Sequence, residues 1–161
     1  MMLLSADFLE LYRRHLCRHS QFGINVLHLV AVVGIYVSLF CIALSFAAGP
    51  WIIGAVLSVY FVILAVRIPP LVLSSVVVTV GLMLGIALSL PQVSVWIHVA
   101  CLVAWHRFQV WNHRIYPEHH DMSDFAGKYR KGPELFFVLA VYELPILLNY
   151  LLFSRRKEAT T

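Results

Sequence analysis

Charged side chains are scarce in this sequence. Lys, Arg, Asp and Glu make up 12% of the 161 residues, whereas an ordinary soluble domain carries about 25%. Amphipathic surface helices alone do not produce such a composition, because their outer faces must be polar. Since 61% of the residues are hydrophobic, the sequence argues against a soluble globular enzyme, a disordered chain and a nucleic-acid-binding module. We predict one small membrane domain over residues 1–161.

Cysteine is scarce as well. The three cysteines, Cys17, Cys41 and Cys101, form no CxxC pair, and two of them lie in apolar stretches. This pattern argues against a disulfide framework and against a zinc ribbon. The net charge of +4 does not indicate a nucleic-acid partner either, because the basic residues flank apolar segments, as the positive-inside rule describes.

Long apolar runs are abundant instead. About 20 apolar residues in a helix cross a hydrocarbon layer of about 30 Å, and the runs here are continuous, unlike the alternating strands of a membrane barrel. We therefore predict an all-α fold, a polytopic membrane helix bundle with four to five transmembrane segments. An interfacial amphipathic helix is predicted within residues 1–24 and a polar loop over residues 112–134. The predicted spans are residues 25–47, 51–66, 71–90, 93–111 and 135–153.

The basic residues predict an orientation. If the first four spans alternate, nine basic residues lie on one side of the membrane: Arg13, Arg14, Arg18, Arg67, Arg107, Arg114, Lys128, Arg130 and Lys131. This side is predicted to be the cytoplasmic face of a bacterial inner membrane or of the endoplasmic reticulum. A complete fifth span would place the basic residues 155–157 on the opposite side. Because Pro145 lies in the middle of that run, we favour a broken or re-entrant segment.

Histidines gather toward the same predicted face. Of the eight histidines, only His98 is remote from it. Random scatter does not favour such a distribution, although a single interfacial histidine often serves only as an amphipathic anchor. The co-location of the histidines, and not any one of them, therefore indicates a metal site. The seven gathered histidines are His15, His19, His28, His106, His113, His119 and His120.

Spacing selects the candidate metal ligands. His15 and His19 are four residues apart, so both rings project from one face of a helix, and His28 begins the next helix. His106 and His113 lie two turns apart, about 10 Å along the axis, and His113 is nearer the interface. We predict that His15, His19, His28 and His113 bind the metal, with His106 in support. Such an all-nitrogen set suits Fe(II) with open positions or a structural Zn, and the ligand types alone do not choose between them.

Two further polar side chains lie at membrane depth. Glu143 is an acid within the fifth apolar run, and an intramembrane acid is by default a functional candidate. Gln109 lies between His106 and His113 on a similar helix face. We predict Glu143 and Gln109 to be the catalytic side chains.

Two segments resemble a known family. The first runs from Tyr12 through the histidine pair to Asn25-Val-Leu-His28, and the second is Trp105-His-Arg-Phe-Gln109-Val-Trp-Asn-His113. Together they are similar to the small membrane 2-hydroxy fatty acid dioxygenases, which include a fungal endoplasmic-reticulum enzyme of phytosphingosine breakdown and bacterial relatives. The spacing differs, since the family's histidine pair is adjacent or nearly so. The resemblance adds Asn25, in the step before His28, as a residue that supports the ligands.

The resemblance implies a function. The protein would be an Fe(II)-dependent dioxygenase in the α-oxidation of 2-hydroxy fatty acids, with Fe²⁺ as cofactor, that shortens the acyl chain by one carbon. Its partners would be a lipid substrate and O₂, with no nucleic acid, and homo-oligomerisation stays open. Arg107, Arg114 or Lys131 would hold the substrate carboxylate. Two alternatives remain: a di-iron, histidine-rich lipid hydroxylase or desaturase, and a non-enzymatic haem-binding or structural membrane protein.

Overall fold

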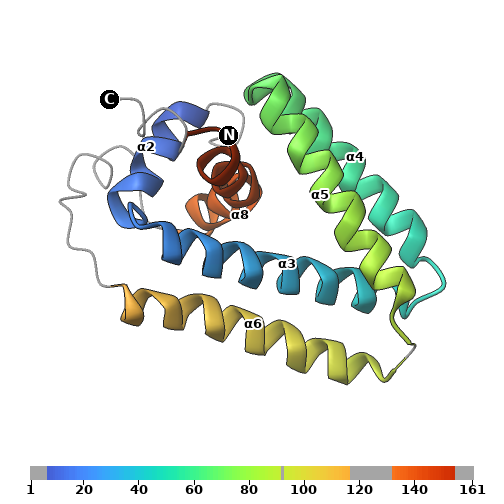
Figure 1. The fold of residues 1–161 in the computed structure, drawn as a ribbon. Coiled ribbons are helices and arrows are strands. Elements are labelled where there is room, and N and C mark those ends of the chain that lie inside the picture. Colours follow the sequence, from blue (N-terminus) through green and yellow to red (C-terminus); the bar gives the residue numbers. More distant parts are fainter. Residues whose placement is uncertain (1–6, 92, 117–131, 155–161) are drawn as a thin grey trace.

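The fold is a bundle of helices. The computed structural model describes residues 7–91, 93–116 and 132–154, and every regular element in them is helical (Figure 1). This confirms the predicted all-α class. The elements are α2 (Phe8–Arg18), α3 (Phe22–Leu44), α4 (Gly49–Arg67), α5 (Pro70–Ser89), α6 (Val95–Ile115), α8 (Pro133–Leu148) and the π-helix η1 (Asn149–Ser154).

Four helical segments of the described chain are long and apolar enough to cross a membrane: Phe22–Leu44, Gly49–Arg67, Pro70–Ser89 and Leu135–Phe153. They make the chain an integral membrane protein and confirm a polytopic bundle. The predicted span over residues 93–111 lies on α6, which has 21 residues but is not among these four. Its C-terminal half carries arginine, histidine, glutamine and asparagine side chains, which lower its hydropathy.

Helix α3 is the centre of the bundle. It contacts α4, α5, α6 and α8, and its largest interface is with α6, which runs beside it (Figure 1). The close approach of the two helices depends on Gly34, because a Cβ built there would lie 2.3 Å from the Trp105 ring. The α3–α6 pair therefore brings the start of α3 beside the end of α6.

We expect Gly34→Ala to destabilise the protein by about 1–3 kcal/mol, the usual cost of overpacking, because the new methyl group overlaps the Trp105 ring. Gly54→Ala is the matched control, since a Cβ at Gly54 meets nothing within 4 Å. Removing a glycine from an open helical position gains up to about 1 kcal/mol. Thermal unfolding in detergent measures both variants. Equal midpoints for the two would contradict tight packing at Gly34.

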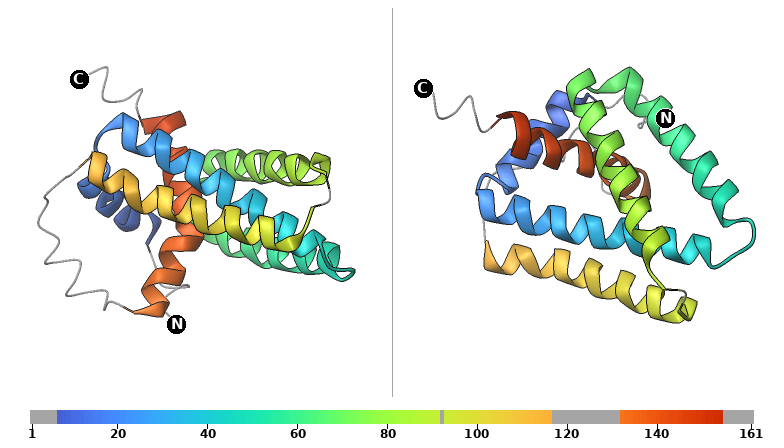
Figure 2. Two further views of the ribbon diagram at one scale, coloured as in Figure 1. Left: turned by 90° about the horizontal axis from the view of Figure 1, so that it is seen from below. Right: turned by 45° about the vertical axis from the view of Figure 1, so that its right-hand side comes forward.

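Helix α8 does not break where the sequence predicted. Pro145 lies inside a continuous α-helix, and the change of hydrogen bonding comes later, in the π-helical segment Asn149–Ser154. Helix α8 runs across α3 and α6 instead of beside them (Figure 2, left). The helix is therefore not interrupted at Pro145, whereas a re-entrant path of residues 135–153 stays a prediction. The crossing direction distinguishes the fifth run from the other helices.

Helix α2 lies beside the crossing helix. Asp7 caps it by accepting a hydrogen bond from the Leu9 backbone N–H at 2.9 Å, which satisfies one of the free donors of a helix start. Phe8 and Leu11 are buried, while Arg13 on the same helix is exposed, so α2 has the predicted amphipathic character. The predicted interfacial segment is therefore an 11-residue helix. Several residues named in the sequence analysis lie outside the described chain: His119, His120, Lys128, Arg130, Lys131 and residues 155–157.

Candidate metal centre

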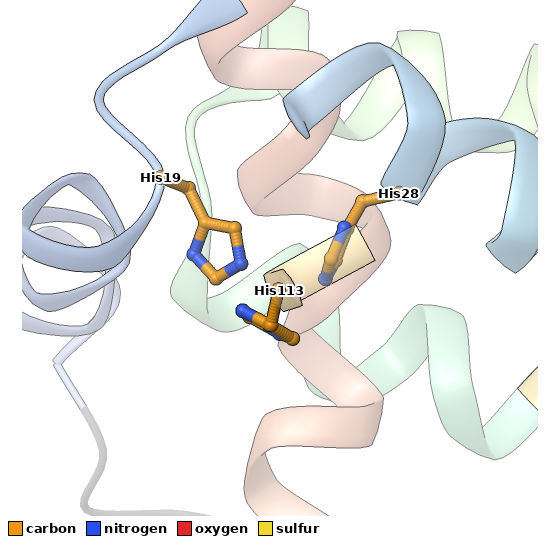
Figure 3. A group of neighbouring side chains, drawn as sticks. All are labelled: His19, His28 and His113. Atoms are coloured by element: carbon orange, nitrogen blue, oxygen red, sulfur yellow. The ribbon is translucent and has the colours of Figure 1, made fainter. Parts of the chain in front are cut away.

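Three histidines from separate elements meet at one end of the α3–α6 pair. The nitrogens that His19, His28 and His113 offer all lie within 4.8 Å of one another. The ring centroids are 4.6 Å apart for His19–His28 and 4.9 Å apart for each of the other two pairs. The rings meet at steep angles and converge on a common space (Figure 3). The sequence therefore predicted correctly that these three side chains come together.

Each element places its histidine for a local reason. Helix α2 ends at Arg18, and His19 caps it with a non-helical backbone, φ −137° and ψ 46°. His28 lies near the start of α3 and His113 in the last turn of α6. Because α3 and α6 are antiparallel neighbours, the start of α3 lies beside the end of α6 (Figure 1).

Asn25 holds the loop that carries His19. It is fully buried, and its Nδ2 donates to the carbonyl oxygens of His19 at 2.6 Å and Gln21 at 2.9 Å. Two carbonyl acceptors fix which side of the amide is nitrogen. The Oδ1 atom therefore faces His15 and accepts a hydrogen bond from its Nε2 at 2.8 Å. Asn25, the residue that the family resemblance added, is thus hydrogen-bonded to His15 and to the backbone of His19.

This network decides where the protons on two histidines lie. Because Nε2 of His15 donates to Asn25, any metal bond from His15 would have to come from Nδ1. His19 Nδ1 donates to the His15 carbonyl at 3.3 Å, which leaves the lone pair on Nε2. That Nε2 atom is buried and makes no hydrogen bond to any described residue. A buried acceptor without a partner is costly, and a metal ion would satisfy it.

Burial keeps these imidazoles neutral. It lowers the pKa of His19 to about 2, and the neighbouring His15, His28 and His113 act in the same direction. Burial also lowers the pKa of His15 to about 4, although the hydrogen bond to Asn25 opposes the change. Metal binding requires deprotonated nitrogen. At neutral pH both rings are therefore in the form that binds a cation.

The spacing of the three donors suits one ion. Three atoms no more than 4.8 Å apart share a point within about 2.8 Å of each, and a metal–nitrogen bond is about 2.0–2.1 Å long. Each ring therefore needs an inward shift of less than about 1 Å. His15 lies outside this triad but stacks on His19, with centroids 4.2 Å apart and planes 9° apart. Among the described residues, the triad fits a metal with open coordination positions.

A cavity of about 770 Å³ opens from the triad and runs between α3, α6 and α8. This volume is within the usual range for small-molecule sites, about 300–1,000 Å³. His15 and His106 join the triad in its wall, so His106 lies at the site without belonging to the metal-binding group. The rest of the wall is mainly apolar, including Val32, Ile35, Leu39, Leu102, Val103, Val110, Phe136, Leu139, Ala140 and Ile146.

Gln109 and Glu143 face each other across this cavity. Nε2 of Gln109 donates a hydrogen bond to Oε1 of Glu143, so α6 and α8 are joined at that point. Gln109 lies one turn from His113, about 6 Å along α6. Among the described residues, Glu143 is the one acid in the cavity wall. The two predicted catalytic side chains are therefore paired next to the triad.

The arginine that lines the cavity is not one that the sequence analysis named as a partner of the substrate carboxylate. Arg107 and Arg114 are exposed and absent from the cavity wall, whereas Arg14 lines it. The signal in the sequence was helical spacing, since Leu11, Arg14 and His15 share one face of α2. His98 lines a separate cavity of about 470 Å³ with Cys41 and other residues, which agrees with its predicted distance from the cluster.

Comparison of the chain with family models, with curated proteins and with solved structures finds no match. The chemistry of the triad and its cavity is therefore what bears on the function.

Proposed function

We propose that this protein is an Fe(II)-dependent dioxygenase that acts on 2-hydroxy fatty acids and shortens them by one carbon. One observation carries the proposal. A triad of histidines, with a buried Nε2 that lacks a hydrogen bond, opens onto a cavity that is polar at the triad and apolar beyond it. Such a cavity suits an amphiphile whose reactive end lies at the metal. The resemblance of the two histidine segments to the dioxygenase family supports the same reaction.

The overall reaction balances without a further reductant. A 2-hydroxy acid, R–CH(OH)–COOH, and O₂ give R–COOH, CO₂ and H₂O. The bond between C1 and C2 breaks, C2 becomes the new carboxyl carbon and C1 leaves as CO₂. The substrate loses four electrons and O₂ gains four. When bound, the iron supplies the binding and reduction of O₂.

The triad adds no charge to that of a bound metal ion. His19, His28 and His113 are neutral ligands, so they leave the charge of a divalent ion uncompensated. An anionic ligand is then favoured at the open positions, and a 2-hydroxy carboxylate offers two oxygens. The triad thereby selects for an acid as the substrate.

Glu143 handles the proton of the substrate hydroxyl. It is the acid of the described cavity wall, and Gln109 directs it by donating to Oε1. A carboxylate within reach of a hydroxyl acts as a general base. Glu143 therefore takes the proton that the hydroxyl releases, while Gln109 keeps the carboxylate turned toward the cavity.

The acyl tail extends away from the triad. Val103 and Val110 of α6 are half-exposed, Phe136 of α8 is 68% exposed, and all three line the cavity. The contacts between α6 and α8 are few, since the main partner of α6 is α3. These exposed apolar side chains of the cavity wall give the substrate a lateral path from the lipid.

The test is turnover by the purified protein in lipid nanodiscs. We expect iron-loaded protein to consume one O₂ for each 2-hydroxypalmitate converted to the shortened acid, measured with an oxygen electrode and by mass spectrometry. Zinc-loaded and metal-free protein serve as controls and should be inactive. Equal activity of metal-free protein, or no consumption of the hydroxy acid by iron-loaded protein, would sink the proposal. Two irons per chain would favour the di-iron alternative, and a Soret band the haem alternative.

We expect Glu143→Gln to lower kcat by about 100-fold, the lower range for loss of a general base, and to leave bound iron unchanged. Glutamine keeps the size of the side chain but is not basic. Glu10→Gln is the control, because Glu10 is an acid of α2 outside the cavity wall. Steady-state kinetics and metal analysis are measured on both variants. Unchanged kcat in Glu143→Gln would remove Glu143 from the reaction.

A further inference from the structure

Helix α2 turns one of two adjacent arginines toward the cavity. Leu11, Arg14 and His15 line it, and their spacing of three and four residues places them on one helix face. Arg14 is half-buried there, whereas Arg13 is exposed and does not line the cavity. The two arginines differ by one position but lie in different surroundings.

Arg14 supplies a fixed positive charge at the polar end of the cavity, where the triad lies. Among the described residues of the cavity wall it is the one arginine or lysine, and a guanidinium stays protonated at every physiological pH. It is next to His15 and five residues before His19, so its charge lies on the side of the cavity where the triad is. The one acid of the described wall, Glu143, is on α8.

The opposite end of the cavity has no charged side chain among the described residues. On α3 the wall runs from His28 to Leu39, and on α6 from His113 to Leu102. Eleven residues of helix cover about 16 Å. A ligand that fills the cavity therefore has a short anionic end and a long apolar part.

We infer that Arg14 binds the carboxylate of a single-chain fatty acid and so anchors the head of the ligand beside the triad. The guanidinium fork matches a carboxylate with two parallel hydrogen bonds. One guanidinium matches the single charge of a carboxylate better than a phosphate monoester, which carries about −1.5 to −2. The inference rests on the proposed function for the identity of the acid as substrate, but the binding itself needs neither iron nor O₂.

The test is ligand binding to metal-free protein in neutral phosphatidylcholine nanodiscs, followed by displacement of a fluorescent fatty acid. The competitors are 2-hydroxypalmitate, palmitate, hexadecanol and lysophosphatidic acid. We expect Arg14→Gln to raise the Kd of both acids by about 10- to 100-fold, the usual effect of losing a charge-assisted hydrogen bond. The Kd of hexadecanol should not change, because it has no charge to lose.

Two variants serve as comparisons. Arg13→Gln removes the same charge from the same helix and should leave every Kd unchanged. Arg14→Lys keeps the charge but not the planar fork, so its Kd for the acids should lie between those of the wild type and Arg14→Gln. Thermal unfolding of each variant checks that the fold is intact.

Three results would overturn the inference. Equal shifts in Arg13→Gln and Arg14→Gln would mean that only bulk charge matters. Weaker hexadecanol binding in Arg14→Gln would mean that Arg14 shapes the cavity instead of binding the head group. Lysophosphatidic acid that bound more tightly than either fatty acid, in a way that depends on Arg14, would identify a phosphate site. Absence of O₂ consumption in the separate turnover assay would end the proposed function but leave the binding result in place.

Discussion

We expect His28→Gln and His113→Gln each to remove the iron of the proposed site and to reduce the proposed turnover of the 2-hydroxy acid to the level of metal-free protein. Each variant takes one of three nitrogens that lie within 4.8 Å of one another, and two neutral ligands bind a divalent ion far more weakly than three. We expect iron to fall from about one ion per chain to less than about a tenth. Glutamine keeps a polar side chain of similar length, which limits damage to the fold around the buried His28.

The control variants are chosen by distance from the triad. His106→Gln changes a histidine that lines the same cavity but is not one of the three, and His98→Gln changes one in the other cavity. Both should keep their iron. Metal analysis by mass spectrometry gives the stoichiometry, and thermal unfolding reports the fold. If the triad variants kept iron, or lost it no more than His98→Gln does, the metal site would lie elsewhere.

The fold was largely readable from hydrophobic runs, because lipid-facing helices have apolar side chains all round. The predicted segments 25–47, 51–66 and 71–90 lie on α3, α4 and α5 with ends within three residues. The direction of the last helix was not readable. A run of apolar residues sets the length of a helix, whereas its crossing angle is set by packing against neighbours. The sequence suggested a break at Pro145, but the α-helix continues past this residue to Leu148.

The histidine cluster was predictable in position but not in detail. His15 and His19 are four residues apart, and a continuous helix would present both to one ion. The helix stops at Arg18, so His19 lies at the cap and its ring stacks on His15. The Nε2–H of His15 donates a hydrogen bond to Oδ1 of Asn25. The role of His15 as a ligand stays a prediction, because only its Nδ1 remains for a metal.

The positions of the arginines relative to the cavity were not readable from the sequence. Arg107 directly follows His106 and Arg114 directly follows His113, but adjacent residues in a helix point about 100° apart. On α6 both therefore face away from the cavity. Arg14 and Arg13 look equivalent in the sequence, and only the burial of Leu11 sets the rotation of α2 and distinguishes them.

Among substitutions of residues that are not themselves candidate metal ligands, Asn25→Leu should be the most damaging. It removes three hydrogen bonds at once: from His15 Nε2, and to the carbonyl oxygens of His19 and Gln21. Each buried group left without a partner costs about 1–3 kcal/mol. We therefore expect a loss of several kcal/mol in the free energy of unfolding, seen as a lower midpoint in thermal unfolding of the detergent-solubilised protein.

The same substitution should weaken metal binding. Asn25 fixes the loop that carries His19 and the proton of His15, and partners of this kind typically change metal affinity by about 10- to 100-fold. Competition with a fluorescent chelator measures the affinity for Fe²⁺ in protein that is still folded. A normal affinity in Asn25→Leu would show that the loop is held by other contacts.

Asn112→Leu is the matched control for the hydrogen bonds of Asn25. Asn112 is also fully buried, but neither its Oδ1 nor its Nδ2 has a partner among the described residues. Replacing a buried amide that makes no hydrogen bond by an apolar side chain of similar size is close to neutral or stabilising. The midpoint of Asn112→Leu should therefore stay at or above that of the wild type, while that of Asn25→Leu falls. Equal losses in the two variants would mean that the shape of the buried side chain, and not its hydrogen bonds, is what holds His15 and His19 in place.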